Sequence, residues 1–249
     1  TLEWEEESYI DMIVATEQGL GLRSITLDPV QDFNLNIHYG ESFQSFNDKL
    51  IERLDKKDKG IVMFHGPPGT GKTHYIRSLI PKLVKMDKRV IIVPKHVLSN
   101  LESPTFNSFM IENFTDERIV FIIEDAESIV AKREAAGGFR SELVSTLLNI
   151  TDGILNDIFN IQVILTFNTE LSSIDEALLR KGRLISKYEF GNLDRKSAKK
   201  LAENIGVNIL DSKESYSLAD IYALKESNDD EILINQNLKK EKDKGFVGF

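Results

Sequence analysis

One eight-residue stretch constrains what this chain can fold into, and it reads Gly66-Pro67-Pro68-Gly69-Thr70-Gly71-Lys72-Thr73. It follows an apolar, β-prone run at 61–64 and precedes a run at 75–80 whose apolar residues have helical spacing. Glycine permits backbone conformations in which successive N–H groups point inward at phosphate oxygens. The following helix N-terminus adds partial positive charge. The stretch therefore predicts a strand–loop–helix unit that binds the phosphates of a nucleotide.

Two side chains of this loop have expected roles of their own. Lys72 is placed to reach the β and γ phosphates, and the short Thr73 hydroxyl is a suitable ligand for Mg²⁺, which prefers oxygen. An ordinary glycine-rich turn is the alternative, but the flanking strand and helix disfavour it. The candidate nucleotide-binding residues are Gly66, Pro67, Pro68, Gly69, Thr70, Gly71, Lys72, Thr73 and His74.

Strand and helix signals alternate around the loop. Apolar runs at 89–93, 119–123 and 161–166 predict buried strands, and helical spacing covers 42–56, 96–101 and 104–113. Pro81 is expected to kink or end the helix after the loop. This alternation predicts an α/β fold, a parallel sheet between two layers of helices. We expect an appended segment at 1–35, a nucleotide-binding core at 36–191, a small helical lid without strands at 192–226 and a charged tail at 227–249.

Composition narrows the class of protein. The 249 residues are 41% hydrophobic, enough for one large domain and a small one. The absence of cysteine excludes disulfides and thiolate chemistry, and no apolar run is long enough to span a membrane. A cytoplasmic location is therefore expected. The formal charge of −9 disfavours broad nucleic-acid binding.

Acidic residues directly follow one of the buried strands. Hydrolysis at a phosphate loop needs a carboxylate for the metal and a polar group for the attacking water. Glu124 is expected to hold Mg²⁺ together with Thr73, and Asp125 to polarise the water, with Glu127 as an alternative base. Simple capping of the next helix is the other interpretation. The end of a parallel strand beside the loop favours the catalytic role.

The motifs, taken together and in order, resemble a AAA+ ATPase of the classical AAA clade. The segments that carry the resemblance are 66–73, 122–127, 131–134, 147–153, 166–168 and 174–183. It implies a P-loop αβα core with a five-stranded parallel sheet, a helical lid, and a ring-shaped, usually hexameric, homo-oligomer. It also implies that Asn168 helps position the attacking water. Arg180 and Arg183 match the arginine fingers that act on a neighbouring subunit's nucleotide, although both could instead be surface residues around Gly182.

Two departures from the family pattern affect the expected function. The order Glu124-Asp125 is reversed, as in the AAA proteins that assemble mitochondrial respiratory complexes, so which acid is the base stays open. The segment 99–103 lacks the aromatic–aliphatic–glycine trio of members that thread substrates. The leading hypothesis is Mg²⁺-dependent ATP hydrolysis that remodels a partner protein. The alternative is a nucleotide-gated assembly switch with slow turnover, and a DNA-acting ATPase is the third possibility.

Overall fold

The computed structural model describes residues 8–17, 19–27, 30, 34–97, 103–127, 148, 159–168, 174–180, 182–209 and 213–226. The expected tail at 227–249, the segment 131–134 and most of 147–153 lie outside these ranges. The chain divides into two compact units. The first contains Thr1–Phe33, Gln44–Pro68 and Lys72–Phe190, and the second contains Asn34–Phe43, Gly69–Gly71 and Gly191–Phe249.

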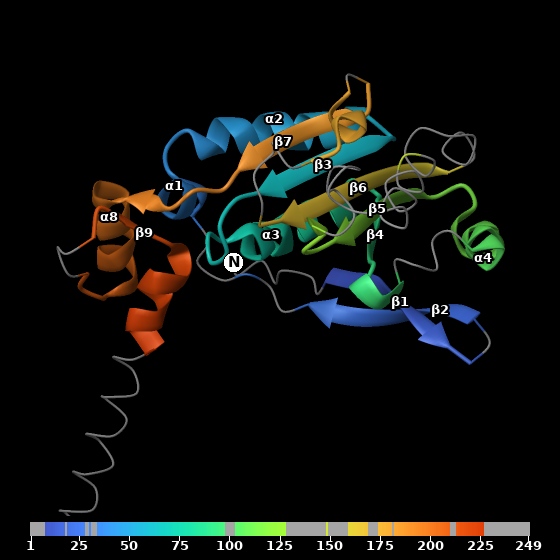
Figure 1. Cartoon of the computed structure of the whole chain (residues 1–249), viewed down its shortest axis with the longest axis horizontal. Coiled ribbons are helices and arrows are strands. Elements are labelled where there is room, and N and C mark those ends of the chain that lie inside the picture. The colour runs from blue at the N-terminus through green and yellow to red at the C-terminus, as the bar shows by residue number, and fades with distance from the viewer. Residues whose placement is uncertain are drawn as a thin grey trace, which may run out of the picture. The chain divides into compact units, whose positions relative to one another are not determined.

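A seven-stranded sheet forms the centre of the first unit, in the order β2-β1-β4-β5-β6-β3-β7 (Figure 1). Its strands are β1 (Ser8–Thr16), β2 (Gly19–Leu27), β3 (Gly60–His65), β4 (Arg89–Ile92), β5 (Arg118–Ile123), β6 (Asn160–Phe167) and β7 (Leu184–Glu189). Neighbours from β4 to β7 are parallel, which confirms the predicted α/β core. Because β5, β6 and β3 are adjacent, their carboxyl ends meet at one edge.

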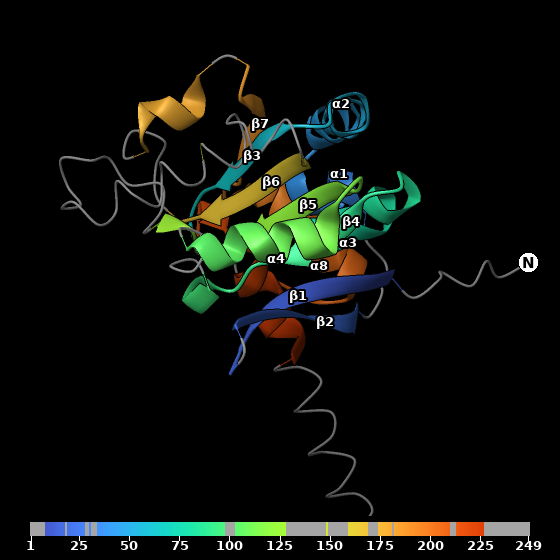
Figure 2. The same ribbon diagram turned by 90° about the vertical axis from the view of Figure 1, so that its right-hand side faces the viewer.

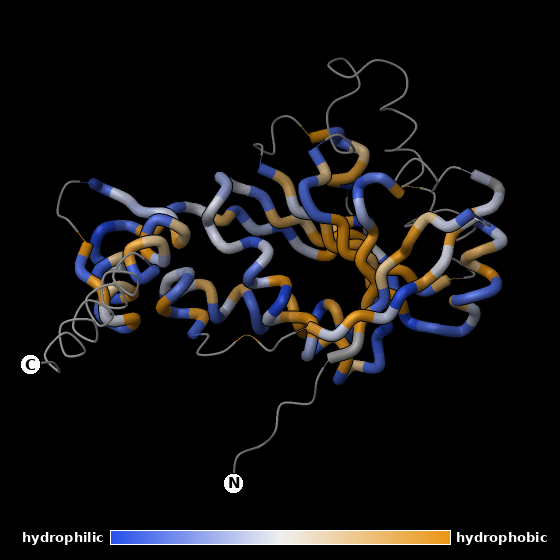
Figure 3. The backbone as a smooth tube through the Cα atoms, turned by 90° about the horizontal axis from the view of Figure 1, so that it is seen from below, coloured by the Kyte–Doolittle hydropathy of each residue, from blue (hydrophilic) through white to orange (hydrophobic). Residues whose placement is uncertain are grey.

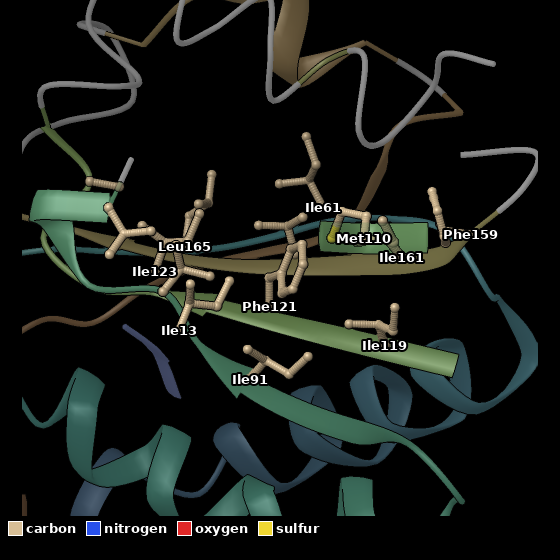
Figure 4. Close-up of a cluster of buried hydrophobic side chains, with 14 of the residues drawn as sticks. Ile13, Ile61, Ile91, Met110, Ile119, Phe121, Ile123, Phe159, Ile161 and Leu165 are labelled. Atoms are coloured by element: carbon tan, nitrogen blue, oxygen red, sulfur yellow. The ribbon is translucent and has the colours of Figure 1, made fainter. Parts of the chain in front are cut away.

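Successive side chains along each strand point to opposite faces of the sheet, and both faces are buried. Ile61 and Met63 of β3 belong to a large apolar cluster on one face, shown in Figure 4. The helix α4 (Pro104–Phe114) adds Phe106, Phe109, Met110 and Phe114 to the same cluster. Phe64 instead packs edge-on against Tyr75 of the helix α3 (Lys72–Lys85), with ring centroids 5.4 Å apart. The strands β3, β5 and β6 are almost entirely buried, and Figure 3 shows hydrophobic stretches of the backbone gathered in the interior. Helices therefore cover both faces, as the sequence predicted.

A hairpin of β1 and β2 widens the sheet beyond the five strands that the family resemblance implied. The two strands pair antiparallel from Ser8↔Leu27 to Thr16↔Gly19, and β1 joins β4 in parallel at Asp11↔Ile91 (Figure 2). An ion pair strengthens this junction, because Arg89 Nε lies 2.7 Å from Asp11 Oδ2. The edge of the parallel sheet at β4 is thus covered by the appended segment.

The predicted helices on either side of the loop are both present. The first is α2 (Phe43–Lys56), and α3 continues past Pro81 to Lys85, so of the two expected effects of Pro81, a kink or an end, the helix does not end there. Pro81 has no N–H to donate to the carbonyl of Arg77. Buried Ile80 and Leu83 hold the helix on the sheet across this point. Within the described ranges, no helix is long and apolar enough to cross a membrane.

The second unit is small and built around α8 (Arg195–Ile205). Asp194 caps its start by accepting from Ser197 N–H at 2.9 Å, and Gly206 ends it in the left-handed conformation. Residues 218–226 form a further helix, and α1 (Leu35–Tyr39) belongs to the same unit. The two-residue strands β8 (Leu193–Asp194) and β9 (Ser215–Tyr216) pair with each other in antiparallel orientation. The expectation of no strand here is wrong, because strands this short leave no alternating pattern in the sequence.

A buried lysine at the start of β4 makes the stability of the first unit depend on pH. Lys88 is 4% exposed, and its amine lies 3.0 Å from Gln162 Oε1. Burial and, to a smaller extent, the charge of nearby Arg118 lower the pKa of Lys88 from its ordinary value of 10.5 to about 8. Between these two values the unfolded chain keeps a proton that the folded chain has lost. The free energy of unfolding therefore rises with pH across this interval, by up to about 3 kcal/mol.

We expect Lys88→Met to flatten this rise between about pH 8 and pH 9.5, because the titrating amine is removed. Urea unfolding at a series of pH values measures the slope. Lys85→Met, at the exposed end of α3, is the matched control and should keep the slope of the unmodified protein. An unchanged slope in Lys88→Met would show that another group titrates.

Candidate active site

The glycine-rich loop leaves the carboxyl end of β3 and enters α3 at Lys72, as predicted. Gly66, Gly69 and Gly71 have φ values of 133°, 78° and 90°, which side-chain-bearing residues rarely adopt. Gly66 is also closed in by the chain itself, since a Cβ atom there would lie 2.0 Å from the carbonyl oxygen of Phe190. His74 lies in the first turn of α3 and is half-buried.

The amine of Lys72 lies across the start of the loop. It donates to the carbonyl oxygens of Gly66 and Pro67, at 2.8 and 2.9 Å, and Lys72 is 7% exposed. Burial lowers the pKa of Lys72, and the negative charges of Asp125 and Glu127 oppose this shift. The lysine is therefore held beside the acidic residues that follow β5, where a phosphate chain would need a positive charge.

Thr73 and Glu124 meet although they are far apart in the sequence. The Thr73 hydroxyl donates to Glu124 Oε1 at 2.5 Å. Glu124 follows β5 directly, and Thr73 is the second residue of α3. A hydroxyl and a carboxylate at this separation form the oxygen-rich pair that Mg²⁺ prefers. The residues present thus fit the metal.

Asp125 has an uncommon backbone conformation, with φ of 50°. Thr166 of β6 holds it there from both sides. Its hydroxyl accepts from Asp125 N–H at 3.0 Å, and its carbonyl accepts from Ala126 N–H at 2.7 Å. Thr166 is 2% exposed, so these bonds are shielded from water. These two hydrogen bonds to Thr166 fix the direction in which the Asp125 side chain points from the end of β5.

Asn168 directly follows β6 and contacts two of the acidic residues that follow β5. Its backbone N–H and its Nδ2 donate to Glu127 Oε1, at 2.7 and 2.9 Å. Nδ2 also lies 3.4 Å from Asp125 Oδ1. Since the amide nitrogen is directed at carboxylates, the amide oxygen faces away from them and can accept a hydrogen bond from another molecule. Asp125 Oδ2 lies 3.4 Å from the amine of Lys95, which follows β4.

The two candidate arginines lie at the opposite end of the sheet from the loop. The carbonyl oxygen of Arg183 accepts from Ile61 N–H at 2.8 Å, at the start of β3, whereas the loop follows the end of that strand. The six residues of β3 separate the two ends by roughly 16 Å. Arg183 Nη1 donates to Ala177 O at 3.0 Å, and Arg180 is exposed. Neither arginine therefore lies near the loop of its own chain.

Sequence reasoning missed two contributors to this arrangement. Lys95 pairs with Asp125 across neighbouring strand ends, and Thr166 determines the conformation of Asp125. A polar residue at the end of an otherwise apolar strand was the available signal for Thr166. Lys95 gave no signal, because a single lysine after a strand is common.

Residues 62–192 match the family described as "ATPase family associated with various cellular activities (AAA)". The chain belongs to the AAA family of ATPases. Its AAA domain runs from β3 to just past β7 and so contains every candidate site residue from Gly66 to Arg183. The domain is a P-loop ATPase domain of an ATP-binding family, as the resemblance predicted.

Curated relatives agree with this assignment. The chain is 31% identical over 198 residues to a "26S proteasome regulatory subunit 4 homolog" of Encephalitozoon cuniculi, covering 72% of this chain and 45% of that protein. It is 28% identical over 178 residues to "Vesicular-fusion protein SEC18" of Candida albicans, covering 63% and 22%. An "AAA ATPase forming ring-shaped complexes" of Corynebacterium kroppenstedtii is 30% identical over 172 residues, covering 62% and 29%. The chain thus spans less than half the length of these relatives.

Proposed function

We propose that this AAA domain hydrolyses ATP with Mg²⁺ at the carboxyl edge of β3, β5 and β6. The protein would work as a homo-oligomeric ring and couple hydrolysis to the remodelling of a partner protein. One observation carries the proposal. The groups needed for metal, water and phosphate lie together at this edge, with Thr73 bonded to Glu124 and Asn168 bonded to Glu127.

Thr73 and Glu124 are the proposed metal-binding residues. Their two oxygens already face one another, and a carboxylate at this point can hold the metal directly or through water. When bound, Mg²⁺ neutralises charge that builds up on the phosphate oxygens. This assignment gives Glu124 to the metal and leaves Asp125 for the water.

Asp125 is the proposed base, with Asn168 orienting the water that it activates. The Asp125 side chain is about half-exposed and reaches toward Asn168 Nδ2. Glu127 is a poorer candidate, because one of its oxygens already accepts two N–H bonds from Asn168. Its proposed role is to hold the Asn168 amide with its oxygen turned outward. A water between Asp125 and that oxygen would have an acceptor for its proton and a second partner.

Assembly follows from the position of the arginines. A positive charge near the γ-phosphate stabilises the transition state, but Arg180 and Arg183 lie a strand's length from the loop of their own chain. They can act only on the nucleotide of another subunit. The relative named for ring-shaped complexes supports a ring, and the absence of cysteine fits a cytoplasmic location.

A slower, switch-like role remains the second candidate. It is favoured by the pair between Lys95 and Asp125 at 3.4 Å. The amine of Lys95 occupies Asp125 Oδ2, which keeps that oxygen from the attacking water. In this version ATP controls assembly, and turnover begins only when Lys95 releases Asp125.

Replacing the proposed base tests the proposed function directly. We expect Asp125→Asn to bind ATP with nearly unchanged affinity and to lose turnover by roughly 10²- to 10⁴-fold, because the proton acceptor is gone. Glu124→Gln should instead raise the Mg²⁺ concentration needed for half-maximal turnover. Calorimetry of ATP binding and phosphate release measure the two effects.

Glu117→Gln supplies the matched control, since Glu117 precedes β5 as Glu124 follows it. Glu117 pairs with Arg89 at 2.9 Å and is remote from the site. Turnover in this variant should match that of the unmodified protein. Retained turnover in Asp125→Asn would contradict the assignment and leave Glu127 as the base. Faster turnover in Lys95→Ala would favour the switch.

A further inference from the structure

Two hydrogen bonds inside the second unit hold the tip of the phosphate-binding loop. The hydroxyl of Tyr39 donates to the carbonyl oxygen of Gly71 at 2.8 Å. The backbone N–H of Ala219 donates to the carbonyl oxygen of Gly69 at 3.0 Å. Gly69–Gly71, Tyr39 and Ala219 all belong to this unit. Neither bond has a role in the site as described so far.

The direction of these bonds determines where the loop N–H groups point. In a trans peptide the carbonyl oxygen and the next N–H lie on opposite sides of the chain, and the described chain has no cis peptide bond. A carbonyl of Gly71 turned toward Tyr39 therefore directs the N–H of Lys72 away from Tyr39. In the same way, the bond from Ala219 directs the N–H of Thr70 away from the helix at 218–226. These N–H groups are ones that a phosphate-binding loop uses.

Tyr39 is itself held firmly in place. Its ring packs against Phe43, with centroids 4.4 Å apart, and Phe43 is fully buried. The helix α1 that carries Tyr39 is capped by Asn34, whose side chain accepts from Asn36 and Ile37 N–H groups. A Cβ atom on Gly71 would lie 2.9 Å from the Tyr39 hydroxyl, so the loop and the tyrosine are in close contact. The hydroxyl thus has little freedom to choose another acceptor.

Ala219 is held with similar firmness. Ser217 and Asp220 cap the helix at 218–226 reciprocally, since Asp220 N–H donates to the Ser217 hydroxyl and Ser217 N–H donates to Asp220 Oδ2. The N–H of Ala219 is one of the first-turn donors that lack a partner within a helix. The carbonyl of Gly69 supplies that partner. The loop tip is therefore bound by a side chain on one side and a helix start on the other.

We propose that Tyr39 is a positioning residue for phosphate binding: its hydroxyl fixes the Gly71–Lys72 peptide with the N–H directed at the nucleotide phosphates, and Ala219 does the same at Gly69–Thr70. This inference rests on the proposed binding of ATP at the loop. It assigns Tyr39 no contact with the nucleotide. Loss of the hydroxyl lets the peptide rotate, so that ordering it again opposes phosphate binding.

The test is Tyr39→Phe in the full chain, which removes the hydroxyl and keeps the ring against Phe43. We expect the dissociation constant for ADP to rise about fivefold, the effect of losing one neutral hydrogen bond. Adenosine, which has no phosphate, should bind both proteins equally, whereas a merely structural role would weaken both ligands alike. Titration calorimetry with ADP, and with adenosine as competitor, measures both.

Tyr222→Phe is the matched control, because it removes a tyrosine hydroxyl of the same unit that is bonded to His38 at 2.7 Å. It should keep the ADP affinity of the unmodified protein, and thermal unfolding of both variants establishes that they are folded. Equal ADP affinity in Tyr39→Phe and the unmodified protein overturns the inference alone. A parallel loss of adenosine binding also overturns it. Failure of the unmodified protein to bind ADP would instead overturn the proposed function.

Discussion

Replacing Arg183 with alanine is expected to reduce ATP turnover by roughly 10³-fold or more while leaving ATP affinity almost unchanged. The reason is the distance between Arg183 and the loop of its own chain, since its carbonyl bonds to the start of β3. A guanidinium there can stabilise the transition state only in a second subunit. In the unmodified protein, turnover per chain should therefore rise with protein concentration until assembly is complete.

Mixing two inactive variants distinguishes action between subunits from action within one. Arg183→Ala retains its loop, and Lys72→Ala retains its arginine, so mixed assemblies contain some complete sites. We expect part of the turnover to return on mixing. Arg77→Ala, an exposed arginine of α3, is the control and should stay active. No recovery on mixing, or full activity of Arg183→Ala at every concentration, would contradict shared sites.

Lys72→Ala is expected to lower ATP affinity by at least about 100-fold, because charge-assisted bonds to phosphate are lost. The Lys72 amine is nearly buried and already in place at the loop, held by the carbonyls of Gly66 and Pro67. Removing it takes away two hydrogen bonds to the loop carbonyls and the positive charge beside the phosphates. Titration calorimetry with ATP measures the loss.

Lys72→Met is the companion variant, since it keeps most of the side-chain volume and removes the charged amine with its hydrogen bonds. It should lose affinity as severely as Lys72→Ala. Equal thermal unfolding temperatures for Lys72→Met and the unmodified protein would exclude a general loss of structure. Unchanged ATP affinity in either variant would mean that the loop does not bind phosphate through this lysine.

The parts of the candidate site whose positions could be predicted from the sequence are those governed by local rules. The loop needs glycine at fixed positions, and apolar strands followed by acids or asparagine bring those side chains to one edge of a parallel sheet. The contact between Thr73 and Glu124 follows from this order. The AAA fold could also be recognised from the sequence, because the family's motifs occur along the chain in the expected order.

What the sequence did not reveal depends on contacts between distant residues without a repeating pattern. The β1–β2 hairpin joins β4 through two residue pairs and one ion pair, and no periodic pattern in the sequence predicts these contacts. The bond between Tyr39 and Gly71 joins positions 32 residues apart. Pro81 shows the reverse case, in which a strong local signal to end a helix is overridden by burial of Ile80 and Leu83.

The close approach of Phe190 to Gly66 affects how relatives of this chain that have lost ATPase activity can be recognised from their sequences. A side chain at position 66 would collide with the chain's own backbone, whether or not a nucleotide ever binds. A pseudoenzyme descended from such a protein would therefore retain this glycine simply to fold. No such backbone collision constrains Lys72 and Thr73, whose side chains are the ones proposed to bind phosphate and metal. An active ATPase is therefore distinguished from an inactive relative by the presence of Lys72 and Thr73, and not by the presence of the first glycine of the loop.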